Sequence, residues 1–234
     1  MQQERTRAEG AREGRHVMEQ VMSRISIPRY TLGEELINAI SHGVGALLSV
    51  AALVMMLLKA KGPLEMSCAM VFGVTMIVLY TVSCLYHALP PTMPAKKILR
   101  VVDHCNVYLL VFGTYVPAAL IGVGGALGWA LFGIVALFTA VGIAFAVVDV
   151  DRYSKIQVVC HLVCGWSFVA GMPALIMNYG IACGALVVAG GIAYSVGAVL
   201  YGLGKNRPYM HSVFHFFCLA GTLFHFLAIY GYLI

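Results

Sequence analysis

Charged side chains are scarce in this sequence of 234 residues. They make up 11% of it, whereas about 25% is usual in soluble domains, and hydrophobic residues make up 61%. A water-soluble globular domain is excluded, because so few polar side chains cannot cover the surface of a core. Intrinsic disorder is excluded as well, since disordered chains combine low hydrophobicity with high charge. The class that remains is a polytopic membrane protein.

Paired cysteines are missing as well. The seven cysteines lie within or at the ends of apolar segments, and none belongs to a C-x-x-C pair. This distribution excludes a disulfide scaffold. It predicts small, buried, reduced side chains that serve the packing of helices.

The scarcity of charge leaves long uncharged segments that can be counted as membrane spans, each of which needs about 20 apolar residues. The segments are 36–58, 66–95, 104–148, 156–204 and 208–234. The third and fourth are long enough for two helices each, with breaks expected at glycine-containing turns in 122–125 and 178–180. The sequence therefore predicts an all-α, polytopic membrane protein, with seven transmembrane helices in one domain that covers residues 31–234.

Lysine and arginine are distributed unequally between the two sides of this predicted bundle. Six lie in a polar tail of residues 1–30, seven in the loops on the tail's side, and only Lys59 and Lys61 on the opposite side. Cytoplasmic loops carry the excess of positive charge, so we expect the N-terminus in the cytoplasm and the C-terminus outside. The net charge of +5 then matches anionic membrane lipids and does not indicate a nucleic-acid partner. The expected location is the cell (plasma or inner) membrane.

The tail permits two interpretations. It lacks the apolar segment of a cleavable signal peptide and carries acids throughout. Apolar residues recur at helical spacing in residues 17–25, as in a short amphipathic helix on the inner leaflet, and a disordered basic tail is the alternative. After the tail, Thr31 and Glu34 have the spacing of a capping box that begins the first span.

Ionisable residues inside a membrane are costly and therefore indicate function. His87 ends the second predicted helix on the tail's side, and Asp103 starts the third helix on that same side. His211 and His215 follow in the seventh helix, roughly 5 and 10 Å below its start at a rise of 1.5 Å per residue. Three segments that are distant in sequence thus bring three histidines and a carboxylate to one layer.

The spacing of these residues predicts a metal site. His211 and His215 are four residues apart, which is how one helix face offers two imidazoles to a single ion. Three protein nitrogens plus a water are typical of a catalytic zinc (Zn2+) site, in which the ion yields hydroxide at neutral pH. The alternative is a set of polar contacts between helices. Zinc is preferred over iron or copper because imidazole-rich sites suit it.

Two further residues have predicted roles in catalysis. Asp103 could hold the water and act as general base and then as general acid. Ser83 lies four residues before His87, one turn deeper on the same helix face, and could hydrogen-bond the water or the oxyanion. The sequence thus predicts Asp103 and Ser83 as the residues that act beside the metal.

A stripe of polar residues marks one face of the first helix. Glu35, Asn38 and His42 are spaced so that they share that face at its tail-side end. We expect them to hold the metal ligands in place, and gating of a substrate or locking of the bundle are the alternatives.

Other polar residues have weaker interpretations. His225 lies about 15 Å deeper than His215 and cannot reach the same ion. It is expected to bond a neighbouring helix, and lining a cavity is the alternative. The charges between the fourth and fifth helices are interpreted as a solvated loop. They are Asp149, Asp151, Arg152 and Lys155.

Four motifs stand out along the chain. They are ELINAISHGVG at 35–45, SCLYH at 83–87, RVVDHCNVY at 100–108 with GTYVP at 113–117, and HSVFH at 211–215. Together they resemble the motifs of the hemolysin III proteins, the bacterial branch of the progestin and adipoQ receptor family, which also contains the adiponectin receptors. The four motifs occur in order at the expected helices, and the resemblance covers about residues 30–234.

The resemblance implies a seven-helix bundle with a zinc ion near its cytoplasmic face. By motif, His87, His211 and His215 would be the ligands, and Asp103 would hold the bound water with Ser83 beside it. The receptor relatives imply hydrolysis of a lipid amide or ester, with a ceramide-like lipid as substrate. The family name implies a pore-forming or cytolytic protein as the alternative. A non-catalytic signalling or membrane-homeostasis protein with structural zinc is the third expectation.

Overall fold

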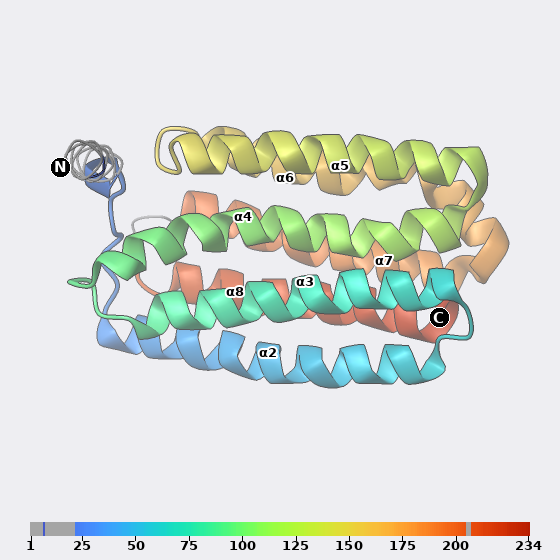
Figure 1. Cartoon of the computed structure of the whole chain (residues 1–234), viewed down its shortest axis with the longest axis horizontal. Helices are drawn as coiled ribbons and strands as arrows, with labels where there is room; N and C mark the ends of the chain where they lie inside the picture. The colour runs from blue at the N-terminus through green and yellow to red at the C-terminus, as the bar shows by residue number, and fades with distance from the viewer. Residues whose placement is uncertain (1–6, 8–21, 205–206) are drawn as a thin grey trace.

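Helices make up almost all of the computed structural model, which describes residues 7, 22–204 and 207–234 (Figure 1). The α-helices are α2 (Leu32–Lys59), α3 (Pro63–Ala88), α4 (Pro94–Pro117), α5 (Gly125–Val148), α6 (Ser154–Trp166), α7 (Met172–Leu203) and α8 (Met210–Ala228). π-Helical segments follow α4 (Ala118–Val123) and α8 (Ile229–Leu233), and a 3-10 segment (Ser167–Gly171) joins α6 to α7. The predicted all-α class is confirmed. The amphipathic helix expected over 17–25 falls largely outside the described residues.

Six continuous helical stretches of the described chain are long and apolar enough to cross a membrane. One of them, Ser154–Leu203, has 50 residues, or roughly 75 Å at 1.5 Å per residue, which is more than twice a hydrocarbon core of about 30 Å. It breaks at Gly180, whose φ of 83° and ψ of 167° are not helical, and the chain reverses at the right-hand end of Figure 1. The stretch is therefore long enough for two passes. The seven predicted helices are present in the described chain, and that all seven cross the membrane stays a prediction.

The other predicted break is also a glycine turn. Gly124 and Gly125 have φ values of 69° and 56°, in the left-handed region that favours glycine. Just before them, Pro117 ends the regular part of α4 because it cannot donate a backbone hydrogen bond, and the π-helical segment follows. Both predicted breaks, 122–125 and 178–180, are thus confirmed.

The helices α2 and α4 begin several residues before the uncharged segments from which they were predicted. The capping box at the start of α2 is confirmed, since Thr31 Oγ1 accepts from Glu34 N at 3.3 Å and Glu34 Oε2 accepts from Thr31 N at 2.8 Å. However, α4 begins at Pro94, so the expectation that Asp103 starts this helix is wrong. Counting uncharged residues misses the first two turns of α4, which are helical although they contain lysine and arginine.

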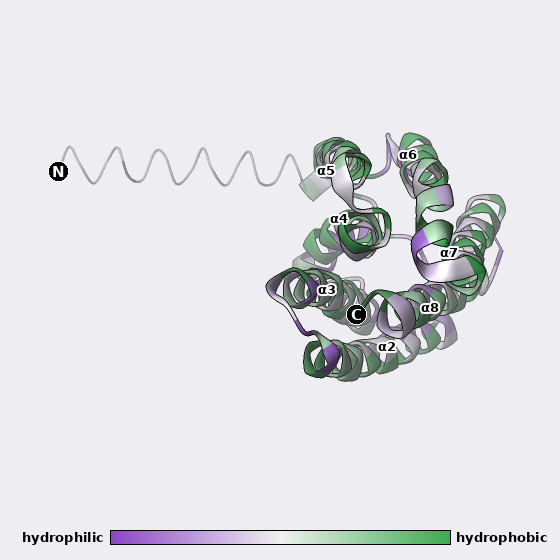
Figure 2. Ribbon diagram, turned by 90° about the vertical axis from the view of Figure 1, so that its right-hand side faces the viewer, coloured by the Kyte–Doolittle hydropathy of each residue, from purple (hydrophilic) through white to green (hydrophobic). Residues whose placement is uncertain are grey.

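The helices form a closed ring when viewed along the bundle (Figure 2). Helices next to each other in sequence pack side by side, and α8 completes the ring by packing on α2 as well as α7. Large apolar side chains stay exposed on the outside, for example Leu58 at 83% and Met177 at 85%. Such a surface suits lipid and not water.

The two ends of the bundle differ in their connections. We call the end at which α2, α4 and α8 begin the tail end, and the opposite end the far end. At the far end, Asn178 Nδ2 donates to the carbonyl oxygens of Gly122 at 3.1 Å and Val123 at 3.4 Å. The turn after α4 and the Gly180 turn are therefore fastened to each other. That the tail end faces the cytoplasm stays a prediction.

Candidate metal centre

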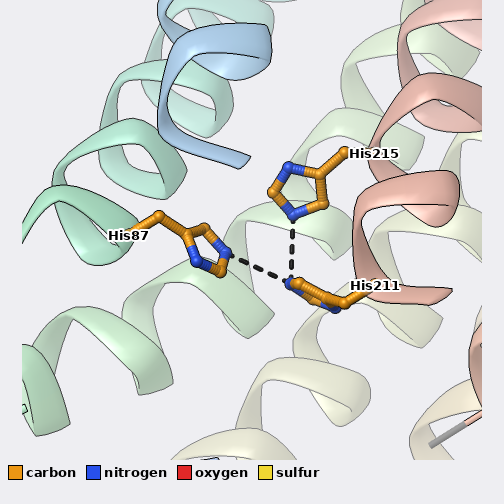
Figure 3. Close-up of side chains that lie close together, drawn as sticks. All are labelled: His87, His211 and His215. Carbon is orange, nitrogen blue, oxygen red and sulfur yellow. Dashed lines mark hydrogen bonds between the residues drawn. The ribbon is translucent and has the colours of Figure 1, made fainter. Parts of the chain in front are cut away.

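Three imidazoles meet at the tail end of the bundle (Figure 3). His87 comes from the last turn of α3, and His211 and His215 come from the first two turns of α8. The antiparallel packing of the bundle brings the end of α3 to the beginning of α8. One ligand atom from each ring lies within 4.8 Å of the others, so the three residues could hold a metal ion. The predicted convergence of these histidines is confirmed.

The distances within this group need an explanation in terms of protons or a cation. Nε2 of His211 lies 3.1 Å from Nε2 of His87 and 3.1 Å from Nε2 of His215. Each ring nitrogen has either one hydrogen or one lone pair, so His211 Nε2 cannot donate to both neighbours at once. A cation placed among the three nitrogens would use a lone pair of each ring. The arrangement therefore fits a metal site better than a hydrogen-bonded chain.

Glu35 determines how His87 presents its ring to the group. Its Oε2 lies 2.6 Å from His87 Nδ1, so Nδ1 carries the hydrogen and Nε2 keeps its lone pair towards His211. The other oxygen of Glu35 accepts from Lys96 Nζ at 2.6 Å, and Lys96 also donates to the Leu89 carbonyl at 2.7 Å. A carboxylate behind a histidine is the usual support of a metal ligand.

Lys96 was not predicted as part of the site, because the sequence suggested only a loop charge that sets orientation. Its side chain is 0% exposed and its partner Glu35 is 14% exposed, so the pair is largely removed from water. The two residues are 61 positions apart, and no periodicity in the sequence links them. The sequence offered one signal that Lys96 lies in a helix and not in a loop, which is its position two residues after Pro94, a residue type that often begins helices.

The two other residues of the α2 stripe also face the histidines. Asn38 is fully buried, with Nδ2 3.5 Å from His87 Nδ1. His42 stacks on His215, with ring centroids 3.6 Å apart and planes 12° apart, and neither of its nitrogens has a hydrogen-bond partner among the described residues. The stripe therefore contacts two of the three histidines, and its role in holding metal ligands stays a prediction.

Asp103 and Ser83 line the same internal cavity as His211 and His215. Ser83 is almost fully buried, and its hydroxyl is a hydrogen-bond donor to the Asp103 carboxylate. Asp103 reaches this position from within α4, not from its first turn. A carboxylate, a hydroxyl and two imidazoles thus border one space, and the catalytic roles of Asp103 and Ser83 stay predictions.

The cavity continues from the histidines along the inside of the bundle. Side chains from α3, α4, α6, α7 and α8 line it, and Ile229 and Leu233 are among those farthest from the tail end. Away from the histidines most of the lining is apolar. His225 also borders this space, and its Nε2 lies 3.2 Å from the Val187 carbonyl of α7. The expected contact with a neighbouring helix and the alternative, a position on a cavity, are both confirmed.

Tyr30 covers the histidine group from the tail end and was not predicted as part of the site. Its ring stacks on His211, with centroids 5.0 Å apart and planes 19° apart, and lies 5.7 Å from the ring of His87. Burial raises the pKa of Tyr30 well above its usual range, so the phenol is neutral. Tyr30 precedes the first span by two residues, and no spacing in the sequence connects it with α8.

The interpretation of residues 149–155 as a solvated loop is incomplete for Asp151, whose side chain is 31% exposed but is held by several bonds. Arg100 donates from Nη2 to Asp151 Oδ1 at 2.6 Å and from Nη1 to Oδ2 at 2.9 Å, while N and Oγ of Ser26 donate to Oδ2 at 3.0 and 2.9 Å. Burial opposes ionisation, yet the bonds and charge of Arg100 and the bonds from Ser26 hold the pKa of Asp151 well below its usual range. Partners this distant in sequence leave no local pattern.

The cysteines agree with the sequence interpretation. All seven are free, and four of them are buried. They pack within the bundle and form no disulfide, as expected for reduced packing residues.

Comparison with known proteins identifies the family of this arrangement. A family model described as "Haemolysin-III related" matches residues 30–226. The chain is 35% identical over 204 residues to "Hemolysin-3" of Bacillus cereus, covering 86% of this chain and 92% of that protein. It is also 35% identical over 206 residues to the "Hemolysin-3 homolog" of Bacillus subtilis (strain 168), covering 87% and 96%. The chain is therefore a multi-pass membrane protein that belongs to the haemolysin III-related family.

Proposed function

We propose that this protein is a zinc-dependent hydrolase that cleaves an amide or ester bond of a membrane lipid inside the bundle. One observation carries the proposal. The imidazole nitrogens of His87, His211 and His215 converge at one end of a cavity that Asp103 also borders. A metal-ligand set, a carboxylate and a space for an apolar substrate are the parts that such a reaction needs.

The donor set is suited to zinc. Tetrahedral zinc with Zn–N bonds of about 2.0–2.1 Å places its nitrogen ligands roughly 3.3 Å apart, close to the two 3.1 Å contacts of His211. His87, His211 and His215 would hold the ion and leave a fourth position open, as in catalytic sites. When bound, zinc acts as a Lewis acid on a carbonyl and lowers the pKa of a water.

The remaining steps are those of the chain's own residues. Asp103 accepts a proton from the attacking water, whose oxygen bonds to the carbonyl carbon of the lipid. The bond from that carbon to nitrogen or oxygen then breaks, and Asp103 returns the proton to the leaving group. Ser83 keeps the Asp103 carboxylate oriented by donating a hydrogen bond to it. One water is consumed, and a carboxylic acid and an amine or alcohol are released.

The cavity supports a lipid as the substrate. Its lining away from the histidines consists mainly of apolar side chains, for example Leu110, Val111, Val187 and Leu233. Such a lining excludes water and accommodates an acyl chain, because burial of apolar surface is favourable. The scissile group at the polar end of the chain would then lie beside Asp103 and the histidines.

Elemental analysis of purified protein tests the metal part of the proposal. The wild type should contain about one zinc per chain, His87→Ala should lose it, and His225→Ala should keep it as a matched histidine control. Asp103→Asn should keep the zinc but lose hydrolysis of a ceramide-like amide or an acyl ester presented in proteoliposomes. Wild-type protein without zinc, or full turnover in Asp103→Asn, would contradict the proposal.

The name of the relatives, hemolysin, favours a second candidate function, the permeabilisation of membranes. The apolar lining of the cavity does not suit a wide polar pore within one chain. Leakage of a dye from liposomes discriminates between the two functions. Leakage that persists in both His87→Ala and Asp103→Asn would support permeabilisation independent of hydrolysis.

A further inference from the structure

A segment that is helical only in its first three residues crosses the tail end of the bundle before α2. We call residues 22–31 the strap. In Figure 1 it is the blue chain that descends along the left-hand end, from the level of α5 to the start of α2. After a short helical turn at its beginning, the strap has no helix until Leu32. It passes the end of the bundle at which the three histidines meet.

The middle of the strap is fastened by a cluster of hydrogen bonds that we call the latch. The Asp151 carboxylate accepts from both N and Oγ of Ser26, and Arg100 donates to the Ser26 carbonyl at 2.7 Å. Arg100 also makes the two-bond ion pair with Asp151, and its side chain is only 6% exposed. The latch therefore holds strap, α4 and the α5–α6 loop together through charge-assisted bonds.

Both ends of the strap are fixed independently of the latch. At one end, Lys97 Nζ donates to the Met22 carbonyl at 2.7 Å. At the other end, the capping box of Thr31 and Glu34 joins the strap to α2. The path of the strap over the site is thus defined at three places. The latch is the place nearest to its centre.

Tyr30 is the part of the strap that lies on the metal site. Its ring is stacked on His211, and its centroid lies 5.7 Å from that of the His87 ring. His211 and His215 line the internal cavity, whereas Tyr30 is not among the residues that line it. Two of the three histidines thus border the cavity, and Tyr30 packs on the group without bordering it.

A metal ion has to reach these nitrogens from water. The route through the bilayer and the internal cavity passes apolar side chains, and moving a divalent ion among them is costly. At the tail end, Glu35 contacts His87 and its side chain is still 14% exposed, so water reaches the surroundings of the group from this side. The strap lies at this end, and the ring of Tyr30 stacks on His211 there.

We propose that the strap is the gate through which the histidine group takes up and releases its metal ion, with Tyr30 as the cover and the Ser26–Asp151–Arg100 cluster as the latch. The inference rests on the proposed function only in that a metal ion binds to the three histidines. Because Tyr30 supplies no ligand atom, opening the gate changes the rates of uptake and release in the same proportion. The affinity for the ion stays the same.

The rate of zinc release to an excess of a water-soluble chelator tests the gate. Asp151→Asn should release zinc about tenfold faster than wild type, which corresponds to about 1.4 kcal/mol less holding the strap closed. Asp149→Asn is the matched control, because the hydrogen bonds of the Asp149 side chain to the described residues come from the backbone N–H groups of Asp151 and Arg152 in its own loop. Tyr30→Ala should release zinc faster than wild type, and Tyr30→Phe should release it as slowly as wild type. The reason is that the ring of Tyr30, and not its hydroxyl, stacks on His211. Equal release rates in Asp151→Asn, Tyr30→Ala and wild type would overturn the gate.

A second measurement does not depend on any metal. A thiol introduced as Tyr30→Cys is labelled with a water-soluble maleimide, and mass spectrometry locates the label among the native cysteines. Adding Asp151→Asn should accelerate labelling at position 30, and adding Asp149→Asn should not. An equal labelling rate at position 30 with and without Asp151→Asn overturns the proposal. A zinc-release rate that Asp151→Asn leaves unchanged, although it accelerates labelling, overturns it as well. Protein that binds no zinc contradicts the proposed function, and the labelling still decides whether the latch holds the cover.

Discussion

The carboxylate of Glu35 lies 2.6 Å from Nδ1 of His87, and this contact decides which nitrogen of the ring faces His211. With the hydrogen on Nδ1, the lone pair of Nε2 points into the histidine group before any ion arrives. The charge of Glu35 is in turn balanced by Lys96, whose side chain has no exposure to solvent. Glu35 at the start of α2 and Lys96 at the start of α4 thus hold the His87 ring in the orientation that metal binding needs.

Removing the charge behind His87 should weaken metal binding. We expect Glu35→Gln to lower the zinc affinity by about 10–100-fold, because a carboxylate raises the basicity of the ligand that it supports. Titration against a competing chelating indicator measures the change. Glu65→Gln is the control at the far end, where Glu65 accepts from the backbone of Lys61. An unchanged affinity in Glu35→Gln would show that His87 needs no such support.

Lys96 should matter for stability more than its place near a loop suggests. Lys96→Met leaves the mostly buried Glu35 without its cationic partner and with His87 as its remaining contact. We expect a loss of up to about 3–5 kcal/mol in the free energy of unfolding. The double variant Lys96→Met/Glu35→Gln should lose less than the sum of its parts, since no charge is stranded. Chemical unfolding in detergent micelles gives the values. The exposed Lys155→Met should change stability by less than about 0.5 kcal/mol.

The latch should contribute to stability over a defined range of pH. The folded-state pKa of Asp151 is held below the unfolded value of about 3.9, so its bonds stabilise the folded state fully above that value. The contribution is lost as the pH falls below about 4. The difference in melting temperature between wild type and Asp151→Asn should therefore be the same at pH 7 and pH 5 and smaller at pH 3. A difference that grows towards low pH would contradict this assignment of the charge.

The contribution of the capping box at the start of α2 to the stability of the protein should be measurable by itself. Thr31→Ala removes the side-chain acceptor for Glu34 N, and we expect a loss of about 1 kcal/mol in the free energy of unfolding. Thr31→Ser keeps the hydroxyl and should lose much less. Thermal unfolding in detergent compares the two variants. Equal stabilities of Thr31→Ala and Thr31→Ser would show that the box does not secure the helix start.

The fold was predictable from the sequence because the membrane imposes simple rules. Length and charge defined the spans, and glycine marked the turns, of which Gly124 and Gly180 have backbone angles that other residues rarely adopt. The meeting of His87 with His211 and His215 was predictable for the same reason. Depth in a helix follows from the rise per residue, and the helix ends alternate between two sides.

The parts that were missed depend on contacts between distant positions. The pairs Lys96–Glu35 and Arg100–Asp151 are 61 and 51 residues apart, and each partner alone has the pattern of an ordinary helix-flanking charge. Tyr30 belongs to a segment whose path over the bundle no periodicity defines. The start of α4 was placed too late because a count of uncharged residues assigns the charged first turns of a helix to the preceding loop.

The hydrogen bonds of Asn178 to the turn after α4 have a mechanical consequence for the whole bundle. They tie together two reversals of the chain that lie at the same end, so the helices that these turns connect are held to one another there. Because α4, α5 and α7 have 24 residues or more, a given tilt about that end would move their opposite ends the most. The histidines and the tyrosine that stacks on His211 lie at that opposite end of the bundle.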